Sequence, residues 1–96
     1  MKVELFGKQG CAVCQTAKNK ISHFLQKWGC ADKVAVEFVD METVDGLAEG
    51  AFRDVVEVPT TIVTCKGKTV ARWDKTVPSV DDFRKAVDGC LSLQSK

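Results

Sequence analysis

Two strand patterns separated by one helical pattern constrain the fold of this chain more than any other feature. Val3 to Phe6 has the length and composition of a strand, and Val34 to Val39 is β-branched, aromatic and nearly all apolar. Between them, apolar residues recur at three- and four-residue steps from Cys14 to Trp28, which is typical of one helix face. Two strands joined through a helix favour parallel pairing with a right-handed crossover.

The rest of the chain adds a weaker helix, a hairpin and a final helix. Strands over Thr60 to Cys65 and Thr69 to Trp73, with a turn at Gly67, predict an antiparallel hairpin. Ser79 or Asp81 can cap the last helix. The weaker helix falls between Asp40 and Asp54, where a short helix is suggested, despite Gly46 and Gly50, by Val44, Leu47, Ala48, Ala51 and Phe52. The predicted order is β-α-β-α-β-β-α.

The pair Cys11-Ala12-Val13-Cys14 lies between the first strand and the first helix. Two cysteines three residues apart at a helix N-terminus can form and break a disulfide. The partial positive charge of a helix N-terminus favours the thiolate, which is the reactive form in thiol–disulfide exchange. Lys8 adds a nearby cation, although it is equally well explained as a loop lysine. The pair is therefore the candidate redox site.

Composition and charge exclude several classes of partner. The chain has 96 residues, 45% of them hydrophobic and 28% charged, with a net charge of +1. Because acids and bases are interspersed, we expect neither a nucleic acid nor an anionic membrane as partner. The longest apolar runs are far shorter than a transmembrane span. We expect one domain over residues 1–96.

The cysteine count predicts a reducing compartment. Five cysteines are an odd number, whereas small secreted disulfide scaffolds usually carry an even set. We therefore expect Cys30, Cys65 and Cys90 to be free thiols, packed mainly as apolar filler. The N-terminus enters a strand pattern directly, without the apolar region of a secretory signal. Both observations favour the cytoplasm.

These motifs together resemble the thioredoxin-like superfamily, in particular its small thioredoxin- and glutaredoxin-like redoxins. The resemblance is carried by the cysteine pair at a helix start and by Val58-Pro59-Thr60 before the hairpin, and it covers essentially the whole chain. It implies an α/β fold with a central four-stranded mixed sheet flanked by three helices. It also implies that Pro59 is cis and that its loop packs beside the disulfide. A trans Pro59 that merely begins an edge strand is the alternative.

The subfamily is mixed. Lys8 and the short N-terminus resemble glutaredoxins, but Ala12-Val13 matches neither the Gly-Pro of thioredoxins nor the Pro-Tyr of glutaredoxins. Gly10 replaces the thioredoxin tryptophan. Leu5 lies at about the spacing of the buried thioredoxin aspartate, and the acidic Glu4 is one residue away on the opposite strand face. The glutathione-binding segment of glutaredoxins is not evident, although Asp81 or Asp82 could substitute.

The resemblance implies a dithiol electron carrier that reduces protein disulfides. Cys11 would be the nucleophile, Cys14 the resolving thiol, and Lys8 would stabilise the thiolate. The implied substrate-binding residues are Ala12, Val13, Val58, Pro59 and Thr60. A reductase such as thioredoxin reductase, a dedicated flavoprotein or, less favoured, glutathione would reopen the disulfide. We expect a monomer with no cofactor beyond this disulfide.

Two other interpretations of the cysteine pair stay open. Cys11 and Cys14 could be structural. They could also belong to a binding module without turnover that carries a metal or an iron–sulfur cluster. Such sites normally need four ligands, and because the chain has no second CxxC, a cluster would have to be shared across a dimer.

Overall fold

The computed structural model describes residues 1–8, 10–29 and 32–94, so the predicted free thiol Cys30 lies outside the described residues. The predicted order of elements is confirmed. The elements are β1 (Lys2–Gly7), α1 (Ala12–Lys27), β2 (Ala35–Asp40), α2 (Val44–Phe52), β3 (Thr60–Cys65), β4 (Lys68–Trp73) and α3 (Val80–Gln94).

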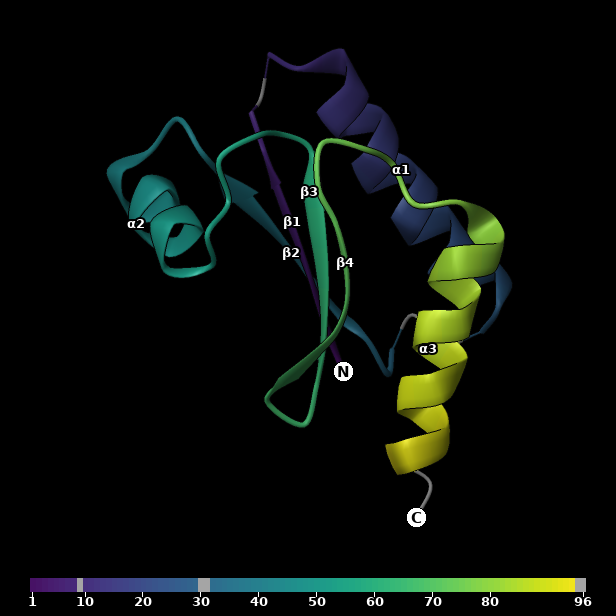
Figure 1. Cartoon of the computed structure of the whole chain (residues 1–96). Helices are drawn as coiled ribbons and strands as arrows, with labels where there is room; N and C mark the ends of the chain where they lie inside the picture. The colour runs from purple at the N-terminus through teal and green to yellow at the C-terminus, as the bar shows by residue number, and fades with distance from the viewer. Residues whose placement is uncertain (9, 30–31, 95–96) are drawn as a thin grey trace.

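The four strands form one mixed sheet in the order β2-β1-β3-β4. β1 pairs with β2 in parallel and with β3 antiparallel, and β3 pairs antiparallel with β4. Helices α1 and α3 lie on one side of the sheet and α2 on the other (Figure 1). The α/β fold with a four-stranded mixed sheet and three helices is therefore confirmed.

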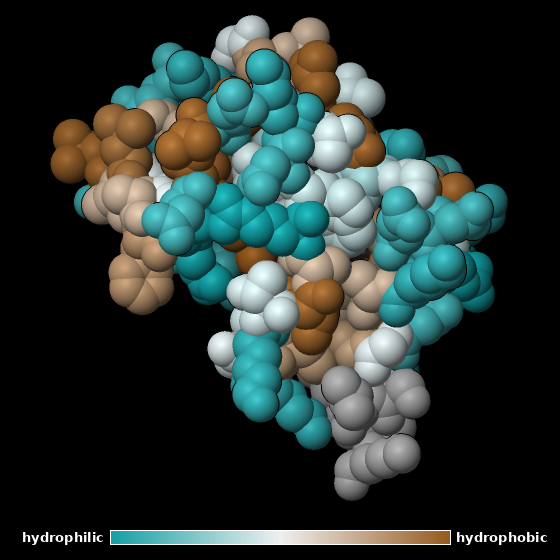
Figure 2. Space-filling view, viewed as in Figure 1, coloured by the Kyte–Doolittle hydropathy of each residue, from teal (hydrophilic) through white to brown (hydrophobic). Residues whose placement is uncertain are grey.

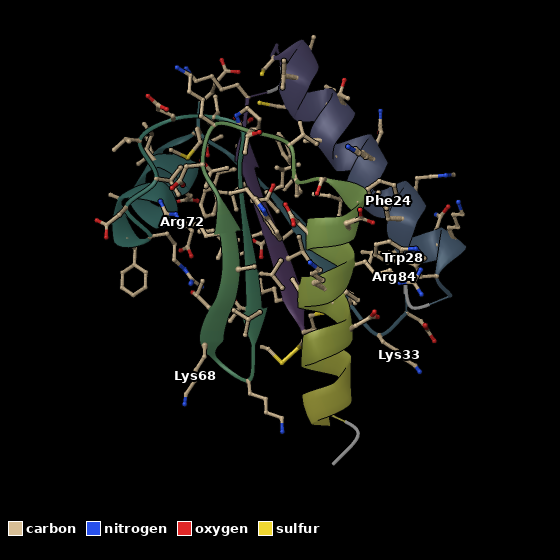
Figure 3. The ribbon with its side chains drawn as sticks, turned by 45° about the vertical axis from the view of Figure 1, so that its right-hand side comes forward. Phe24, Trp28, Lys33, Lys68, Arg72 and Arg84 are labelled. Atoms are coloured by element: carbon tan, nitrogen blue, oxygen red, sulfur yellow. A yellow bond between two sulfur atoms is a disulfide. The ribbon has the colours of Figure 1, made fainter. Side chains whose placement is uncertain are left out.

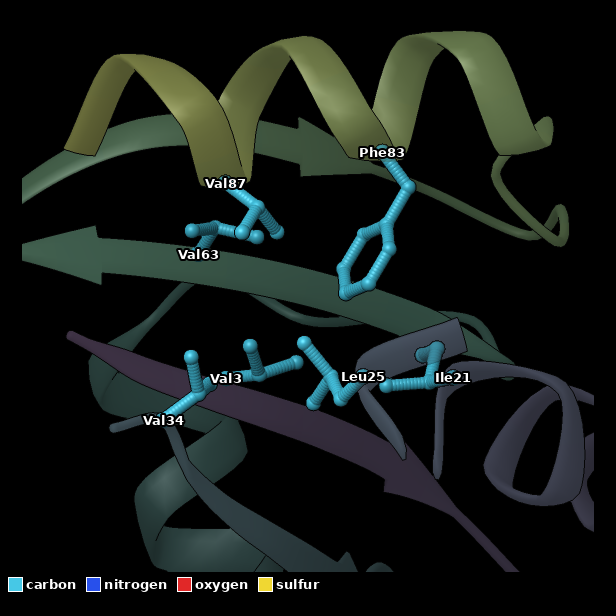
Figure 4. Packing of buried hydrophobic residues seen from close by; sticks show 7 residues of the cluster. All are labelled: Val3, Ile21, Leu25, Val34, Val63, Phe83 and Val87. Atoms are coloured by element: carbon cyan, nitrogen blue, oxygen red, sulfur yellow. The ribbon is translucent and has the colours of Figure 1, made fainter. Parts of the chain in front are cut away.

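The larger core cluster lies between the sheet and the helices α1 and α3. Its buried members are Val3, Ile21, Leu25, Val34, Val63, Phe83 and Val87 (Figure 4). Aromatic rings extend this cluster at its edge. Trp28 stacks on Phe24 and Phe83 with ring centroids 5.4 and 5.9 Å away, and Trp73 lies 6.1 Å from Phe83. Both tryptophans are partly buried, as expected for rings that cover the edge of a core.

Ser79 begins the last helix, as one of the two predicted caps. Its hydroxyl oxygen accepts a hydrogen bond of 3.2 Å from the backbone N–H of Asp82, and its carbonyl accepts one from Phe83. Asp81 instead lies within the first helical turn. The carboxylates of Asp81 and Asp82 there interact favourably with the positive end of the helix dipole.

The predicted short helix is present as α2, but the apolar residues that suggested it do not form its buried face. Val44, Leu47 and Phe52 are exposed, and the buried residues of this helix are Gly46 and Gly50. Without side chains, these glycines allow the helix backbone to approach the chain near Asp40 and Met41. The apolar side chains consequently point away from the sheet. Beneath α2 the smaller core cluster consists of Phe6, Val39, Val55 and Ile62.

Candidate active site

The two cysteines of the CxxC pair occupy the first turn of α1. Cys11 is the N-cap, with extended backbone angles, and its sulfur accepts a hydrogen bond of 3.2 Å from the backbone N–H of Cys14. A serine or aspartate oxygen does the same at many helix starts. The Cys11 N–H donates to the carbonyl of Lys8, which closes the loop after β1. Both cysteines are free thiols in this structure.

Burial separates the two thiols. Cys11 is partly exposed, whereas Cys14 is fully buried. Cys14 packs against Gly7, the last residue of β1, at a distance that leaves no room for a side chain at that position. The strand therefore fixes the inner thiol, and the helix start presents the outer one to solvent.

The surroundings shift the two thiol pKa values in opposite directions. The hydrogen bond with the Cys14 side chain, followed by the bond from its backbone N–H, lowers the pKa of Cys11 below the ordinary 9.0, and the charge of Lys8 makes a smaller contribution. Burial, followed by the hydrogen bond with Cys11, raises the pKa of Cys14 above 9.0. Because a thiolate is the nucleophile, the exposed Cys11 is the more reactive of the two.

The Val58-Pro59-Thr60 segment lies at the same end of the sheet as the cysteine loop. Thr60 pairs with Phe6 in the antiparallel β1–β3 register, one residue before Gly7. The Val58–Pro59 peptide bond is cis. Pro59 and Thr60 are buried and Val58 is half-buried; the Thr60 hydroxyl donates a hydrogen bond of 2.7 Å to the carbonyl of Glu57. The loop is thus stabilised by a hydrogen bond between two of its own residues.

The outer surface at the helix start is small and apolar. Ala12 is exposed, and 52% of the Val13 surface is accessible. A Cβ at Gly10 would meet no atom within 4 Å. A methyl group at Gly10 would therefore be tolerated without a clash.

The acidic residue of β1 does not lie on the side of the active-site thiols. Glu4 is 1% exposed and forms an ion pair of 2.8 Å with Arg53, at the end of α2. It therefore belongs to the α2 side of the sheet. Leu5, at the spacing of the thioredoxin aspartate, is buried and apolar. Among the described residues, no group of three or more His, Cys, Asp or Glu side chains is placed to hold a metal ion.

A second cysteine pair corrects the prediction of free thiols. Cys65, the last residue of β3, is disulfide-bonded to Cys90 of α3, with their Cα atoms 5.8 Å apart (Figure 3). Their burial was predicted, but their bond was not. Two thiols separated by 25 residues meet only because α3 packs back along the hairpin. That tertiary proximity has no signal in the sequence.

The two cysteine pairs are associated with opposite ends of β3. Thr60, at the cysteine-loop end, and Cys65 bound this six-residue strand. At about 3.3 Å per residue, their Cα atoms are roughly 16 Å apart. The buried disulfide is thus remote from the Cys11 loop.

Fold and site together define a protein of the thioredoxin-like fold: a mixed sheet with a CxxC pair and a cis-proline loop at one end. The structure is similar to thioredoxin 1 from Thermosipho africanus, with a TM-score of 0.77 and 23% identity over 100% of both chains. It is also similar to thioredoxin O2 from Arabidopsis thaliana in the oxidised state, with a TM-score of 0.73 and 18% identity over 92% of this chain and 72% of that one.

Thioredoxin from Fasciola hepatica gives a TM-score of 0.71 and 20% identity over 93% of this chain and 79% of that one. No model of a protein family matches the chain, and no curated protein matches it either. The chain therefore shares the thioredoxin architecture at low sequence identity. No helix in residues 1–8, 10–29 and 32–94 has the length and apolar character to cross a membrane.

Proposed function

We propose that this protein is a thiol–disulfide oxidoreductase that reduces protein disulfides through Cys11 and Cys14. The observation that carries the proposal is the division between the two thiols. Cys11 is partly exposed with a lowered pKa, and Cys14 is buried beside it with a raised pKa. Such a division suits one attacking thiolate and one resolving thiol.

In the first step, the Cys11 thiolate attacks one sulfur of a substrate disulfide. A bond forms between Cys11 and that sulfur, the substrate S–S bond breaks, and the other substrate sulfur leaves as a thiolate that takes a proton from solvent. Lys8 stabilises the Cys11 thiolate. The exposed Ala12 and Val13 contact the substrate beside the mixed disulfide.

In the second step, Cys14 attacks the sulfur of Cys11, and the proton of Cys14 passes to the departing substrate thiolate. The Cys11–Cys14 disulfide forms and the second substrate thiolate leaves, so the substrate gains two electrons and the pair loses two. Val58 pairs through its backbone with the substrate chain, and Pro59 and Thr60 hold that loop. A reductase such as thioredoxin reductase, or glutathione, returns the two electrons; the protein needs no other cofactor and acts as a monomer.

A redox titration with alkylation and mass mapping of each cysteine tests this function. We expect Cys11 and Cys14 to switch together as a two-electron couple, roughly within −270 to −120 mV. Cys11→Ser should abolish disulfide reduction, while a Cys65→Ala/Cys90→Ala variant should retain it. A pair that never closes, or a fully active Cys11→Ser variant, would refute the proposal, and metal analysis would then test the carrier alternative.

The sequence also favours a cytoplasmic location for this oxidoreductase. The Cys65–Cys90 disulfide argues against it, because disulfides are rare in reducing compartments. Acid quenching and alkylation of the protein in the cells that make it decides the point. A reduced Cys65 and Cys90 pair in those cells would support the cytoplasm, and an oxidised pair would argue against it.

A further inference from the structure

Helix α2 packs with its glycine face towards the rest of the protein. Gly46 and Gly50 are four residues apart and therefore share one stripe of the helix, and both are buried. A Cβ at Gly46 would overlap the carbonyl oxygen of Asp40, and one at Gly50 would overlap the side chain of Met41. This face therefore approaches the end of β2 and Met41 closely, and the opposite face of α2 is exposed.

That outer face is apolar. Val44 and Phe52 are 84% and 82% exposed, Leu47 is 54% exposed, and Val56 in the following loop is 91% exposed. These four residues are called the α2 patch below. Figure 2 shows hydrophobic residues gathered over α2, on the left of the molecule. Large apolar side chains grouped at this exposure mark interaction sites more often than isolated ones do.

Hydrogen bonds and an ion pair fix both ends of α2, the helix that carries most of the α2 patch. Arg72 of β4 donates hydrogen bonds to the carbonyls of Arg53 and Asp54, just after the helix. The Arg53 guanidinium pairs with the buried Glu4 at 2.8 Å. Thr43 caps the N-terminus through a hydrogen bond of 2.9 Å from Gly46. The patch is therefore a fixed surface.

Acidic residues surround the α2 patch in the chain. Between residues 40 and 57 the only base is Arg53, which is engaged with Glu4, while the whole chain has a net charge of +1. The acids of this segment are Asp40, Glu42, Asp45, Glu49, Asp54 and Glu57. Two of them are paired, Glu49 with Arg53 at 3.8 Å and Glu57 with Lys75 at 3.9 Å. A second copy of the chain docked here about a twofold axis would bring these acids together, and like charges disfavour that arrangement.

We propose that the α2 patch docks the protein substrate of the redox site, through an apolar patch of that substrate bordered by lysines or arginines. This inference rests on the proposed function. Val56 is three residues before Pro59, so their Cα atoms lie within about 11 Å of each other. One protein surface can therefore cover both the α2 patch and the cis-proline loop. The substrate class is a disulfide-bonded protein with a basic, apolar surface.

The test uses two synthetic peptides with one internal disulfide and the same Leu and Phe residues, one carrying Lys and the other Glu at all charged positions. A small organic disulfide reports the redox step alone. We expect the protein to reduce the Lys peptide with roughly tenfold higher kcat/KM than the Glu peptide. Val44→Ser/Phe52→Ser should raise KM for the Lys peptide and leave the rate with the small disulfide unchanged.

Val70→Ser is the matched control, because Val70 is also an exposed valine, at 45%, but lies on β4. Glu42→Gln/Asp45→Asn should reduce the preference for the Lys peptide. Equal KM values for Val44→Ser/Phe52→Ser and Val70→Ser, or no preference between the peptides, would overturn the docking proposal while leaving the redox function intact.

A binding measurement that needs no turnover distinguishes failure of the redox function from failure of the docking proposal. In the Cys11→Ser/Cys14→Ser background, fluorescence anisotropy should show tighter binding of the Lys peptide, and Phe52→Ser should weaken it. Binding of neither peptide in this background would overturn the proposal. Self-association in sedimentation equilibrium that Phe52→Ser abolishes would also overturn it, in favour of a second copy of the chain.

Discussion

Cys14 rests directly on Gly7: a Cβ at Gly7 would lie 2.9 Å from both the Cβ and the Sγ of Cys14, and 3.2 Å from the ring of Phe38. The inner thiol of the pair is thus positioned by the absence of a side chain on β1. Because Cys14 also supplies the hydrogen bonds that lower the pKa of Cys11, Gly7 acts on the outer thiol through the inner one.

Gly7→Ala should displace Cys14 and so raise the pKa of Cys11 towards 9.0. Overpacking of this kind costs about 1–3 kcal/mol of unfolding free energy. Gly10→Ala is the control, since a Cβ there meets open space. The pH dependence of alkylation and urea unfolding measure the two effects. An unchanged Cys11 pKa in a folded Gly7→Ala variant would contradict the positioning role.

The two thiols should also titrate apart in the unmodified protein. Alkylation follows the thiolate fraction, so the rate at Cys11 should rise with pH to a midpoint below 9.0, and that at Cys14 to a midpoint above it. Cys14→Ala should move the Cys11 midpoint upward, because it removes the largest cause of the lowering. Lys8→Gln should move it less. Mass spectrometry after timed alkylation gives each midpoint, and a larger effect of Lys8→Gln would refute this ranking.

The patterns that were read correctly from the sequence are local ones. The CxxC pair at a helix start, the hairpin around Gly67 and the Ser79 cap each depend on residues a few positions apart, and the structure has all three. The resemblance also placed Val58-Pro59-Thr60 before β3, where it lies at the cysteine-loop end of the sheet.

What the sequence did not reveal concerns contacts between distant segments. Val44, Leu47 and Phe52 predicted the helix α2 but not its orientation, which Gly46 and Gly50 set by close approach to Asp40 and Met41. Periodicity identifies an apolar face and does not reveal whether that face is covered. In the same way, Cys65 and Cys90 were predicted to be buried, and their bond follows only from the packing of α3.

The buried disulfide should stabilise the fold without taking part in turnover. A closed loop with a sequence separation of 25 corresponds to about 3.5 kcal/mol on the chain-entropy estimate. The comparison is between oxidised and reduced protein in the Cys11→Ser/Cys14→Ser background, where the two forms differ only in the Cys65–Cys90 bond. Urea unfolding should give the lower midpoint for the reduced form. Equal midpoints would show that the bond adds no stability.

Two helical glycines should respond oppositely to the same methyl group. Gly46→Ala should destabilise the protein by about 3 kcal/mol, because the new Cβ would overlap the backbone oxygen of Asp40. Gly89→Ala lies within α3, where the new Cβ would meet no described atom within 4 Å beyond its chain neighbours and the helix backbone, and should stabilise the protein by about 0.8 kcal/mol. Thermal or urea unfolding measures both. An unchanged unfolding free energy in Gly46→Ala would contradict the close approach of α2 to Asp40.

The partners of Arg53 should differ in their effect on stability. Arg53→Met leaves the carboxylate of Glu4, 1% exposed, without its ion-pair partner and should cost about 3 kcal/mol. Glu49→Gln removes an exposed partner 3.8 Å away and should change the unfolding free energy by about 0.5 kcal/mol or less. Urea unfolding at neutral pH compares the two variants. Similar losses of unfolding free energy would show that the buried Glu4 pair contributes no more stability than the exposed Glu49 pair.

The bond between Cys65 and Cys90 makes a covalent ring of the chain from the end of β3 to the third turn of α3. The loop between Trp73 and Val80 lies inside this ring. If a protease cuts that loop, the two fragments stay one molecule, and only a reductant separates them. The nicked protein keeps its molecular weight on a non-reducing gel, apart from the added water, and α3 stays tethered to the sheet on which it packs.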